Sequence, residues 1–489
     1  MAVSHYPSLY QINTRVRHRS FCRDQGRTAG IDDWPDSEWQ GVAEQGFDWI
    51  WLLGVWQTGQ AGAQVSKSHE PWQQGFQASL ADLSEDDICG SCFAVVRHQT
   101  ADELGGEEAL SRVRKKLNER GLKLMLDFVP NHTALDHPWV REHPEFYIQG
   151  SKENVEREPQ NYIKLETRQG KQVFAYGRDP YFDGWPDALQ LDYSNPKVQE
   201  SMIGELLAIA ERCDGVRCDM AMLILPEVFE RTWGKRIELF WPKAIAAMRE
   251  RFPDFVLLAE VYWDLEWTLQ QQGFDYTYDK RLYDRLRDRV GRPVREHLVA
   301  GLDFQSKLAR FLENHDEPRA AETFPQDAHE AAAIVTFLSP GLRFFHDGQL
   351  TGKSVQIPIH LCRGPEETAD RRLSEFYSDL LQTLQRPVFR SGEWALTACH
   401  PINDGNETWQ DFIVYRWQAG KEVTWVAVNY AAQPGRCRLE RSPPHQDQNQ
   451  SRPQDLLDSA SPTPIVEVNA GEMLFDFPAW GYRVFTLSS

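Results

Sequence analysis

The chain has 489 residues, of which 41% are hydrophobic, and its formal net charge is −19. A chain of this length can bury a large core and is expected to hold more than one domain. The acidic balance argues against the basic face that nucleic-acid-binding proteins need, so we expect no nucleic-acid partner. No apolar run has the length of a membrane span, so we expect no membrane partner either. The first ten residues lack the basic end and apolar run of a signal peptide, which predicts a cytoplasmic location.

Apolar segments typical of buried strands recur along the first 350 residues and are separated by helical stretches. Eight strands are predicted, beginning near residues 8, 47, 123, 215, 255, 274, 309 and 342. Helices are predicted over residues 36–45, 105–120, 197–212, 228–251, 265–272, 328–338 and 371–385. Eight strand–helix units predict a (β/α)8 TIM barrel of the α/β class, whose active site lies at the carboxyl ends of the strands.

Two segments interrupt the barrel pattern. Residues 54–104 are polar and rich in Gly and Asp, which predicts a long functional loop. Residues 133–190 are rich in Pro, Gly, Tyr, Trp and charge, and we expect them to form a short inserted subdomain B after the third strand. The catalytic barrel would then comprise residues 1–132 and 191–390.

The C-terminal residues 391–489 have a different pattern of short alternating strands, for example at 411–417, 423–429 and 480–486. Turn-rich hydrophilic segments separate them, most obviously residues 441–463. The pattern predicts an antiparallel β-sandwich domain of about a hundred residues.

Eight cysteines are scattered along the chain, and two of them, Cys89 and Cys92, have the C-x-x-C spacing of redox and zinc motifs. No second pair and no Cys or His partner lies at metal-ligand spacing. We therefore interpret Cys89 and Cys92 as free thiols in a loop and predict no metal site there.

Four of the predicted strands end in polar side chains, at Asp127, at Arg217 and Asp219, at Glu260, and at Asp316. Arg217 and Asp219 are two positions apart, so their side chains share one face of a strand, and the arginine would keep the acid ionised and oriented. A lone pair of this kind is more often a structural ion pair. Four such strand ends on the functional rim of one barrel indicate a site instead.

Three acids at one site suit retaining glycoside hydrolysis, in which a nucleophile and an acid/base lie about 5–5.5 Å apart. Asp219 beside Arg217 suits the ionised nucleophile. Glu260 lies between apolar neighbours that raise the pKa of a carboxyl group, which suits the proton donor. Asp316 would bind sugar hydroxyls and favour the charged transition state. The 17 tryptophans also favour a carbohydrate site, because aromatic faces stack on sugar rings.

These segments resemble the four signature regions of the α-amylase superfamily of glycoside hydrolases, in the expected order and spacing. Asp127-x-x-x-Asn131-His132 resembles the first region and Gly215-x-Arg217-x-Asp219 the second. Glu260 corresponds to the acid/base of the third, and Asn314-His315-Asp316 to the fourth. The resemblance covers the barrel, the insert and the C-terminal sandwich.

The resemblance implies further site residues. His132 and His315 would bind the glucose unit at the cleavage point, and Arg217 would orient the nucleophile. Phe93 falls where relatives usually place a tyrosine that stacks on that glucose. Phenylalanine can stack in the same way but lacks the hydroxyl group.

The resemblance also bears on calcium. In many relatives Asn131 and the backbone of a histidine four residues after the nucleophile hold a calcium ion, and a lysine precedes that histidine. Met222 and Leu223 occupy those two positions here, which argues against a structural calcium ion. We expect that the chemistry itself requires no cofactor.

The leading hypothesis is therefore an α-amylase-like retaining enzyme that cleaves α-1,4-linked glucans or maltooligosaccharides. An α-glucosidase or a glucan-transferring enzyme would use the same acids and is the first alternative. A non-catalytic carbohydrate-binding barrel ranks lower because all three acids are present. A barrel acting on phosphorylated metabolites ranks lowest, because no Gly-rich phosphate loop follows the seventh or eighth strand.

Overall fold

The computed structural model describes residues 5–440, 453–458, 465–468 and 471–487. Eight parallel strands close into a barrel in the order β1-β14-β13-β12-β11-β10-β5-β2. They are β1 (Ser8–Asn13), β2 (Trp49–Leu53), β5 (Lys123–Phe128), β10 (Gly215–Cys218), β11 (Val256–Ala259), β12 (Tyr276–Tyr278), β13 (Leu308–Arg310) and β14 (Leu342–His346). The predicted barrel and all eight of its predicted strands are confirmed.

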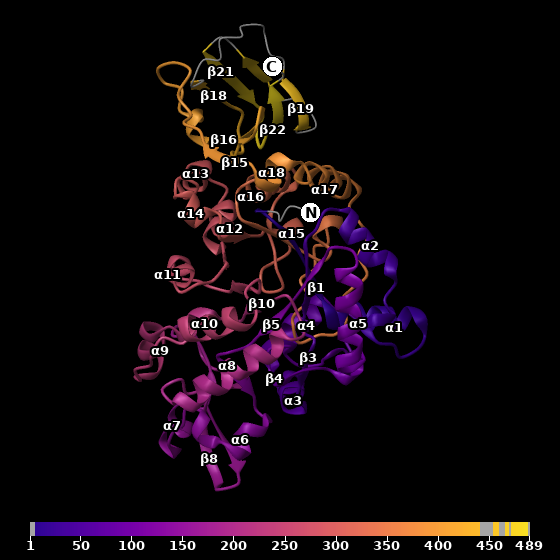
Figure 1. The fold of residues 1–489 in the computed structure, drawn as a ribbon, viewed down its shortest axis with the longest axis vertical. Helices are drawn as coiled ribbons and strands as arrows, with labels where there is room; N and C mark the ends of the chain where they lie inside the picture. Colours follow the sequence, from indigo (N-terminus) through magenta and orange to yellow (C-terminus); the bar gives the residue numbers. More distant parts are fainter. Residues whose placement is uncertain (1–4, 441–452, 459–464, 469–470, 488–489) are drawn as a thin grey trace.

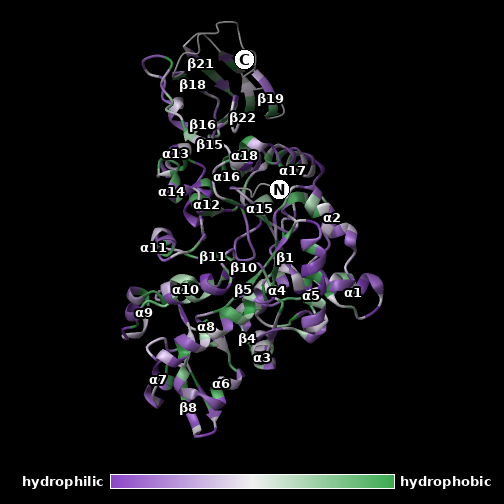
Figure 2. Ribbon diagram, in the orientation of Figure 1, coloured by the Kyte–Doolittle hydropathy of each residue, from purple (hydrophilic) through white to green (hydrophobic). Residues whose placement is uncertain are grey.

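Most residues of the barrel strands are apolar, and the strands are covered on both sides. All five residues of β2 are buried, for example, with Trp51 inside the barrel core. Hydrophobic residues concentrate on the central strands, whereas the outer helix α1 (Thr14–Gln25) is largely hydrophilic (Figure 2). No helix is predicted from the sequence at α1, because its few buried residues make a weak apolar pattern.

The outer helices match the predictions within a few residues. They include α2 (Asp36–Glu44), α5 (Gly106–Asn118), α8 (Pro196–Ala210), α11 (Glu266–Gln271), α16 (Gln326–Phe337) and α17 (Arg371–Leu384). One prediction was wrong. Residues 228–251 form two helices, α9 (Pro226–Trp233) and α10 (Trp241–Arg251), because Gly234 adopts a φ of 66° and ends the first.

The prediction of a long loop over residues 54–104 was also wrong. The segment contains β3 (Trp56–Thr58), α3 (Gln60–Ser68), α4 (Glu70–Ser79) and β4 (Val95–Thr100). The helices α3 and α4 bury only Gly62, Ser66 and Phe76, so their sequences lack the apolar stripe that normally indicates a helix. Cys89 and Cys92 do lie in a loop, and neither forms a disulfide.

A four-stranded antiparallel sheet follows β5 along the chain and lies at the lower end of the view in Figure 1. Its strands, in the order β6-β9-β8-β7, are β6 (His132–Ala134), β9 (Trp185–Gln190), β8 (Gly170–Gly177) and β7 (Tyr162–Thr167). The sheet begins four residues after β5 ends, so it stands directly beside the rim of the barrel. The subdomain limits at residues 133 and 190 stay predictions.

The C-terminal part contains two antiparallel sheets at the opposite end of the molecule (Figure 1). One comprises β15 (Glu393–Leu396), β16 (Phe412–Ala419), β17 (Glu422–Asn429), β22 (Tyr482–Leu487) and β19 (Pro453–Asp458), and the other β18 (Gly435–Glu440), β21 (Glu472–Phe477) and β20 (Ile465–Val468). The antiparallel pattern was predicted. Within the predicted turn-rich segment 441–463, residues 453–458 form a strand, and the others lie outside the described residues.

No helix among the described residues is both long enough and apolar enough to cross a bilayer. Residues 1–4, which enter the signal-peptide prediction, lie outside the described residues.

The C-terminal sheet is bound to the barrel by buried hydrogen bonds. The indole N–H of Trp417 donates to the carbonyl of Leu338 at 2.7 Å, and the Tyr415 hydroxyl donates to the carbonyl of Ile334 at 3.2 Å. Leu338 follows the last residue of α16, where the helix cannot satisfy its carbonyl, whereas the carbonyl of Ile334 also accepts the backbone N–H of Leu338 at 3.1 Å. Trp394 pairs with Trp417 across the two strands, but its own indole N–H has no partner among the described residues.

Replacing each of the two tryptophans by phenylalanine should therefore lower the free energy of unfolding by different amounts. Trp417→Phe leaves a buried carbonyl unsatisfied and a small cavity, and should lower the free energy of unfolding by about 2–4 kcal/mol. Trp394→Phe removes a similar volume but no hydrogen bond and should cost about 1 kcal/mol. Urea unfolding followed by circular dichroism measures both. Equal losses would contradict the interpretation.

Candidate active site

Arg217 and Asp219 lie at the end of β10, at the centre of the barrel. Arg217 has no solvent exposure, and its Nη1 lies 2.6 Å from Oδ1 of Asp219. The backbone N–H of Asp219 donates to the carbonyl of Phe128 at 2.8 Å, which fixes the acid beside the end of β5. Burial raises the pKa of Asp219, and the contact with Arg217 opposes that rise.

Glu260 stands at the same height on the neighbouring strand, because Cys218 and Ala259 are paired in register. Its Oε2 lies 2.7 Å from Nη2 of Arg217 and accepts a hydrogen bond from the backbone of Met220 at 2.7 Å. The Tyr262 hydroxyl donates to its Oε1 at 2.8 Å. Burial raises the pKa of Glu260 to about 7, with Arg217 opposing the rise. Asp219 and Glu260 therefore share one guanidinium group.

Asp316 and His315 follow β13. Nε2 of His315 lies 3.1 Å from Oδ2 of Asp316, and Nδ1 of His315 lies 2.9 Å from the side-chain amide nitrogen of Gln11. The amide oxygen of Gln11 lies 2.7 Å from Nδ1 of His346, which can only donate to it. Gln11 must then donate to His315, so the proton of His315 sits on Nε2, beside Asp316 but without a hydrogen-bond partner among the described residues.

The remaining sugar-binding candidates surround the acids. The Phe93 ring centre lies 5.5 Å from that of His315 and 4.9 Å from the Arg217 guanidinium. His132 packs against Trp185, with ring centres 5.2 Å apart. Burial lowers the pKa of His132 to about 4 and that of His315 to about 3, so both rings are neutral at pH 7. All seven residues predicted for the site come together at the mouth of the barrel.

Asp127 was expected at the rim of the barrel without an assigned role, and Tyr278, Gln11 and Tyr262 were not predicted for the site. Asp127 lies 3.8 Å from Arg217, and burial raises its pKa to about 7. The Tyr278 hydroxyl accepts a hydrogen bond from Nε of Arg217 at 3.3 Å. Gln11 and Tyr262 hold His315 and Glu260 in place. Asp127 and Tyr278 lie in predicted strands, but nothing in their local sequence indicates which side chain they contact.

Asn131, the candidate calcium ligand, is occupied by another side chain. Its side-chain oxygen accepts a hydrogen bond from the amide of Gln190 at 3.0 Å, and its own amide donates to the Gln190 oxygen at 3.2 Å. Met222 and Leu223 are buried and apolar. Calcium requires six to eight oxygen ligands, often carboxylates. These side chains do not fit a calcium ion.

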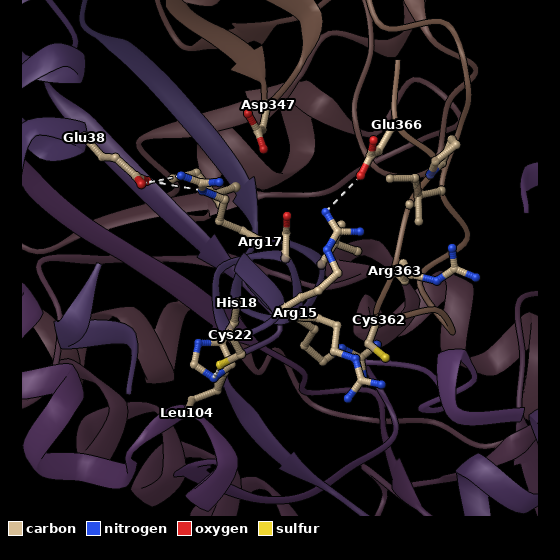
Figure 3. A pocket seen from close by; sticks show the side chains of 18 of the residues that line it. Arg15, Arg17, His18, Cys22, Glu38, Leu104, Asp347, Cys362, Arg363 and Glu366 are labelled. Carbon is tan, nitrogen blue, oxygen red and sulfur yellow. Dashed lines mark hydrogen bonds and ion pairs between the residues drawn. The ribbon is translucent and has the colours of Figure 1, made fainter. Parts of the chain in front are cut away.

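A separate cavity of about 1530 Å³ opens beside α1, outside the acid cluster (Figure 3). Its lining includes Arg15, Arg17 and His18 of α1 and, across from them, Cys362 and Arg363. None of the three acids lines it. The catalytic chemistry therefore belongs to the mouth of the barrel and not to this cavity.

Comparisons with known proteins agree with this geometry. The family model of the alpha-amylase catalytic domain matches residues 97–283. The chain is 25% identical over 296 residues to alpha-amylase 3 of Dictyoglomus thermophilum, covering 56% of each chain. It is 23% identical over 350 residues to the alpha-amylase MalA of Haloarcula japonica, covering 69% of this chain and 47% of that one. A trehalose synthase/amylase of Mycolicibacterium smegmatis is 25% identical over 255 residues, covering 45% of this chain and 41% of that relative.

Among solved structures, a maltogenic alpha-amylase from Thermotoga neapolitana has the same fold, with a TM-score of 0.70 over 99% of both chains at 17% identity. The aligned region spans about half the length of the curated relatives. The matched residues 97–283 include Arg217, Asp219 and Glu260.

The Asn131–Gln190 pair predicts that calcium has no effect on stability. Addition of EGTA or of calcium should leave the midpoint of thermal unfolding unchanged, because a ligand shifts it only by binding the folded state. Gln190→Ala breaks the amide pair and should lower the midpoint equally under both conditions. A midpoint that falls with EGTA and is restored by calcium would refute the prediction. Differential scanning calorimetry provides the measurement.

Proposed function

Since the chain belongs to the α-amylase superfamily, we propose that it is a retaining glycoside hydrolase acting on α-1,4-linked glucans or maltooligosaccharides. The observation that carries the proposal is the guanidinium of Arg217, which contacts both Asp219 and Glu260. Two carboxylates on one guanidinium stay close together, as the retaining mechanism requires with its separation of about 5–5.5 Å.

In the first step, an oxygen of Asp219 attacks the anomeric carbon while the bond to the leaving oxygen breaks. Glu260 gives its proton to that oxygen, so the leaving sugar departs as an alcohol. The pKa of Glu260, raised by burial to about 7, keeps a substantial fraction of the acid protonated at neutral pH. Asp219 remains the nucleophile because Arg217 lies 2.6 Å from it and stabilises its charge.

In the second step, Glu260 has become a carboxylate and takes a proton from an incoming water molecule. The resulting hydroxide attacks the anomeric carbon, and the bond to Asp219 breaks. Arg217 remains within 2.7 Å of Glu260 and stabilises the charge that Glu260 now carries. The guanidinium of Arg217 thus stabilises the charge of Asp219 in the first step and that of Glu260 in the second.

The sugar at the cleavage point would be held by neutral donors and an acid. His315 presents its Nε2 proton beside Asp316, and both can bind adjacent hydroxyl groups of one sugar. The Asp316 side chain is 38% exposed, the most accessible of the three acids, so it can meet an arriving substrate. Phe93 offers a ring face at the same place.

A glucosyl-transferring enzyme or an α-glucosidase is the alternative, with the same covalent intermediate. The transferase uses a sugar hydroxyl as acceptor, whereas an α-glucosidase uses water and differs in releasing single glucose units. The similarity to a trehalose synthase/amylase supports the transferase alternative. Hydrolases and transferases differ in whether water or a sugar hydroxyl attacks in the second step. Product analysis at low maltose concentration separates them, because a transferase still forms mainly new disaccharides or longer chains there, whereas a hydrolase forms mainly glucose.

Removal of the nucleophile provides the first test. Asp219→Asn should lower kcat for maltooligosaccharide cleavage by about 10⁴-fold or more, since no covalent intermediate can form. Arg212→Gln, a half-buried residue outside the site that pairs with Glu107, is the control and should retain activity. Release of reducing sugar at an undiminished rate by Asp219→Asn would refute the assignment.

The pH dependence provides a second test. Glu260 must be protonated in the first step, and an acid is protonated below its pKa, so kcat/KM should fall as the pH rises above about 7. Glu260→Gln should lose this alkaline limb. It should also react faster with α-glucosyl fluoride than with maltotriose, because fluoride leaves without a proton. An unchanged alkaline limb in Glu260→Gln would assign it to another group.

A further inference from the structure

We propose that the sugar-binding pocket is closed on its non-reducing side and that Asp187 and His360 bind the terminal glucose there. The enzyme would then act on chain ends and not in the middle of long glucans. The inference rests on the proposed function and adds to it the form of the substrate. It follows from one segment, residues 353–364, called here the crossing segment.

The crossing segment follows β14, carries no helix or strand of its own, and is bound to residues 87–90. The backbone N–H groups of Cys89 and Gly90 donate to the carbonyl of His360 at 2.9 and 3.2 Å. The backbone N–H of Cys362 donates to the carbonyl of Asp87 at 2.9 Å, and Ile88 and Leu361 form an antiparallel bridge. These contacts join two segments that are about 270 positions apart in the sequence.

Side chains reinforce this attachment. Leu361 is fully buried in a small apolar cluster with Phe76, Leu80 and Ile88. Arg363 pairs with Asp87, whose pKa it holds far below the usual value. The crossing segment is therefore a packed wall. The cavity beside α1 lies against it, with Ile357, Cys362 and Arg363 in its lining (Figure 3).

The same segment reaches the catalytic acids. The side-chain amide of Gln356 donates to the backbone carbonyl of Asp316 at 2.8 Å. The carbonyl of Gln356 accepts a hydrogen bond from Ser79 of α4 at 2.9 Å. The crossing segment thus connects the residue that would hold the sugar to the helices that follow β2. A glucan chain cannot pass through these contacts without breaking them.

At this wall, Asp187 lies 3.8 Å from Nε2 of His360. The Asp187 side chain is almost completely buried, and its Oδ2 has no hydrogen-bond partner among the described residues. A buried carboxylate oxygen without a partner is costly and normally indicates a missing ligand group. Burial raises the pKa of Asp187 to about 6, so it is mostly ionised at pH 7 and can accept hydrogen bonds from hydroxyl groups.

Asp187 is close to the residues that would hold the sugar. It lies two positions from Trp185 on β9, and Trp185 packs on His132. A Cβ atom added at Gly62 would lie 3.3 Å from Ala94 and 3.8 Å from Asp187, so Asp187 and the residue next to Phe93 both lie beside Gly62. Trp72 lies between His360 and His69, with its ring tilted against both and ring centres 4.3 Å from each. Acid, histidine and aromatic rings of this kind suit a terminal sugar.

The other side of the site is different. Glu260 protonates the leaving oxygen, so the leaving part of the substrate lies on its side. Trp263, three residues further on, has a φ of 66° and packs against Tyr181 at 5.0 Å. Tyr181 is 57% exposed, and its neighbour Phe182 is 74% exposed. The leaving-group side thus presents an open aromatic surface, whereas the opposite side ends at a wall.

The first experiment compares two maltoheptaoses labelled at the reducing end, one of which carries a 4,6-O-ethylidene group on its non-reducing glucose. We expect the free substrate to shorten in steps of one fixed length and the blocked substrate to react about 100-fold more slowly. Equal cleavage of both would overturn the inference and leave the proposed function intact. Cleavage of neither would reject the proposed function and this inference with it.

The second experiment tests Asp187 through the hydroxyl groups it would bind. Wild-type enzyme should cleave maltotriose about tenfold or more faster than analogues lacking the terminal 4- or 6-hydroxyl, because a buried acceptor loses its partner. Asp187→Asn should cleave maltotriose more slowly and lose most of this discrimination against at least one analogue. His360→Gln should weaken it as well.

The control is Glu166→Gln, an exposed change on β7 in the same sheet, which should keep both rate and discrimination. Thermal unfolding shows whether each variant is folded. Full discrimination in a folded Asp187→Asn enzyme would overturn the role of Asp187. A variant that lost only stability would still show the wild-type ratio of rates, which separates a structural role from substrate binding.

Discussion

The structure of the site depends on one buried cation, the guanidinium of Arg217. It lies within 2.6–3.8 Å of Asp219, Glu260 and Asp127, and none of these four side chains is appreciably exposed. Burying several acids together is strongly unfavourable unless a positive charge and hydrogen bonds compensate them. Because one cation lies among three acids, ionising all three acids at once would leave negative charge without compensation. A site of this composition favours a charged nucleophile beside a protonated partner, which is the division of roles that glycoside cleavage needs.

Arg217 in turn constrains the barrel around it. It projects from β10 into the interior, where the rings of Trp51, Phe93 and Tyr278 lie 4.9–5.9 Å from its guanidinium carbon. These rings exclude water and so strengthen every charge interaction in the site. The parallel register places Arg217 beside Asp127 on one neighbouring strand and sets Asp219 level with Glu260 on the other. The fold therefore determines the electrostatics, because a shift of one residue in either strand would turn an acid away from the cation.

Short motifs and strand ends in the sequence predicted the catalytic acids. Few of the residues that act on the site through distant partners could be predicted. Asp219, Glu260 and Asp316 were predictable because each follows an apolar strand, and strand ends converge in a barrel. The helices α3 and α4 were not, since they bury almost no apolar side chains. Gln11, Gln190 and His360 were also missed. Each acts through a partner 59 to 304 positions away, and no local pattern records such a pairing.

These long-range contacts explain how closely related chemistry can serve different substrates. The acids and Arg217 belong to the rigid strand ends, where little can change without loss of the reaction. The segments that border the site, such as the crossing segment, are connections between barrel elements, and the sequences of such connections vary more freely. Here the Asn131–Gln190 pair joins the inserted sheet to the barrel, and the carbonyl of His360 joins the crossing segment to residues 89–90. Both junctions contain hydrogen bonds between neutral groups, and the Arg363–Asp87 ion pair reinforces the attachment of the crossing segment. Apart from the hydrogen bond from Gln356 to the backbone carbonyl of Asp316, these contacts do not involve the acids, so the connecting segments can change while the acid cluster is kept.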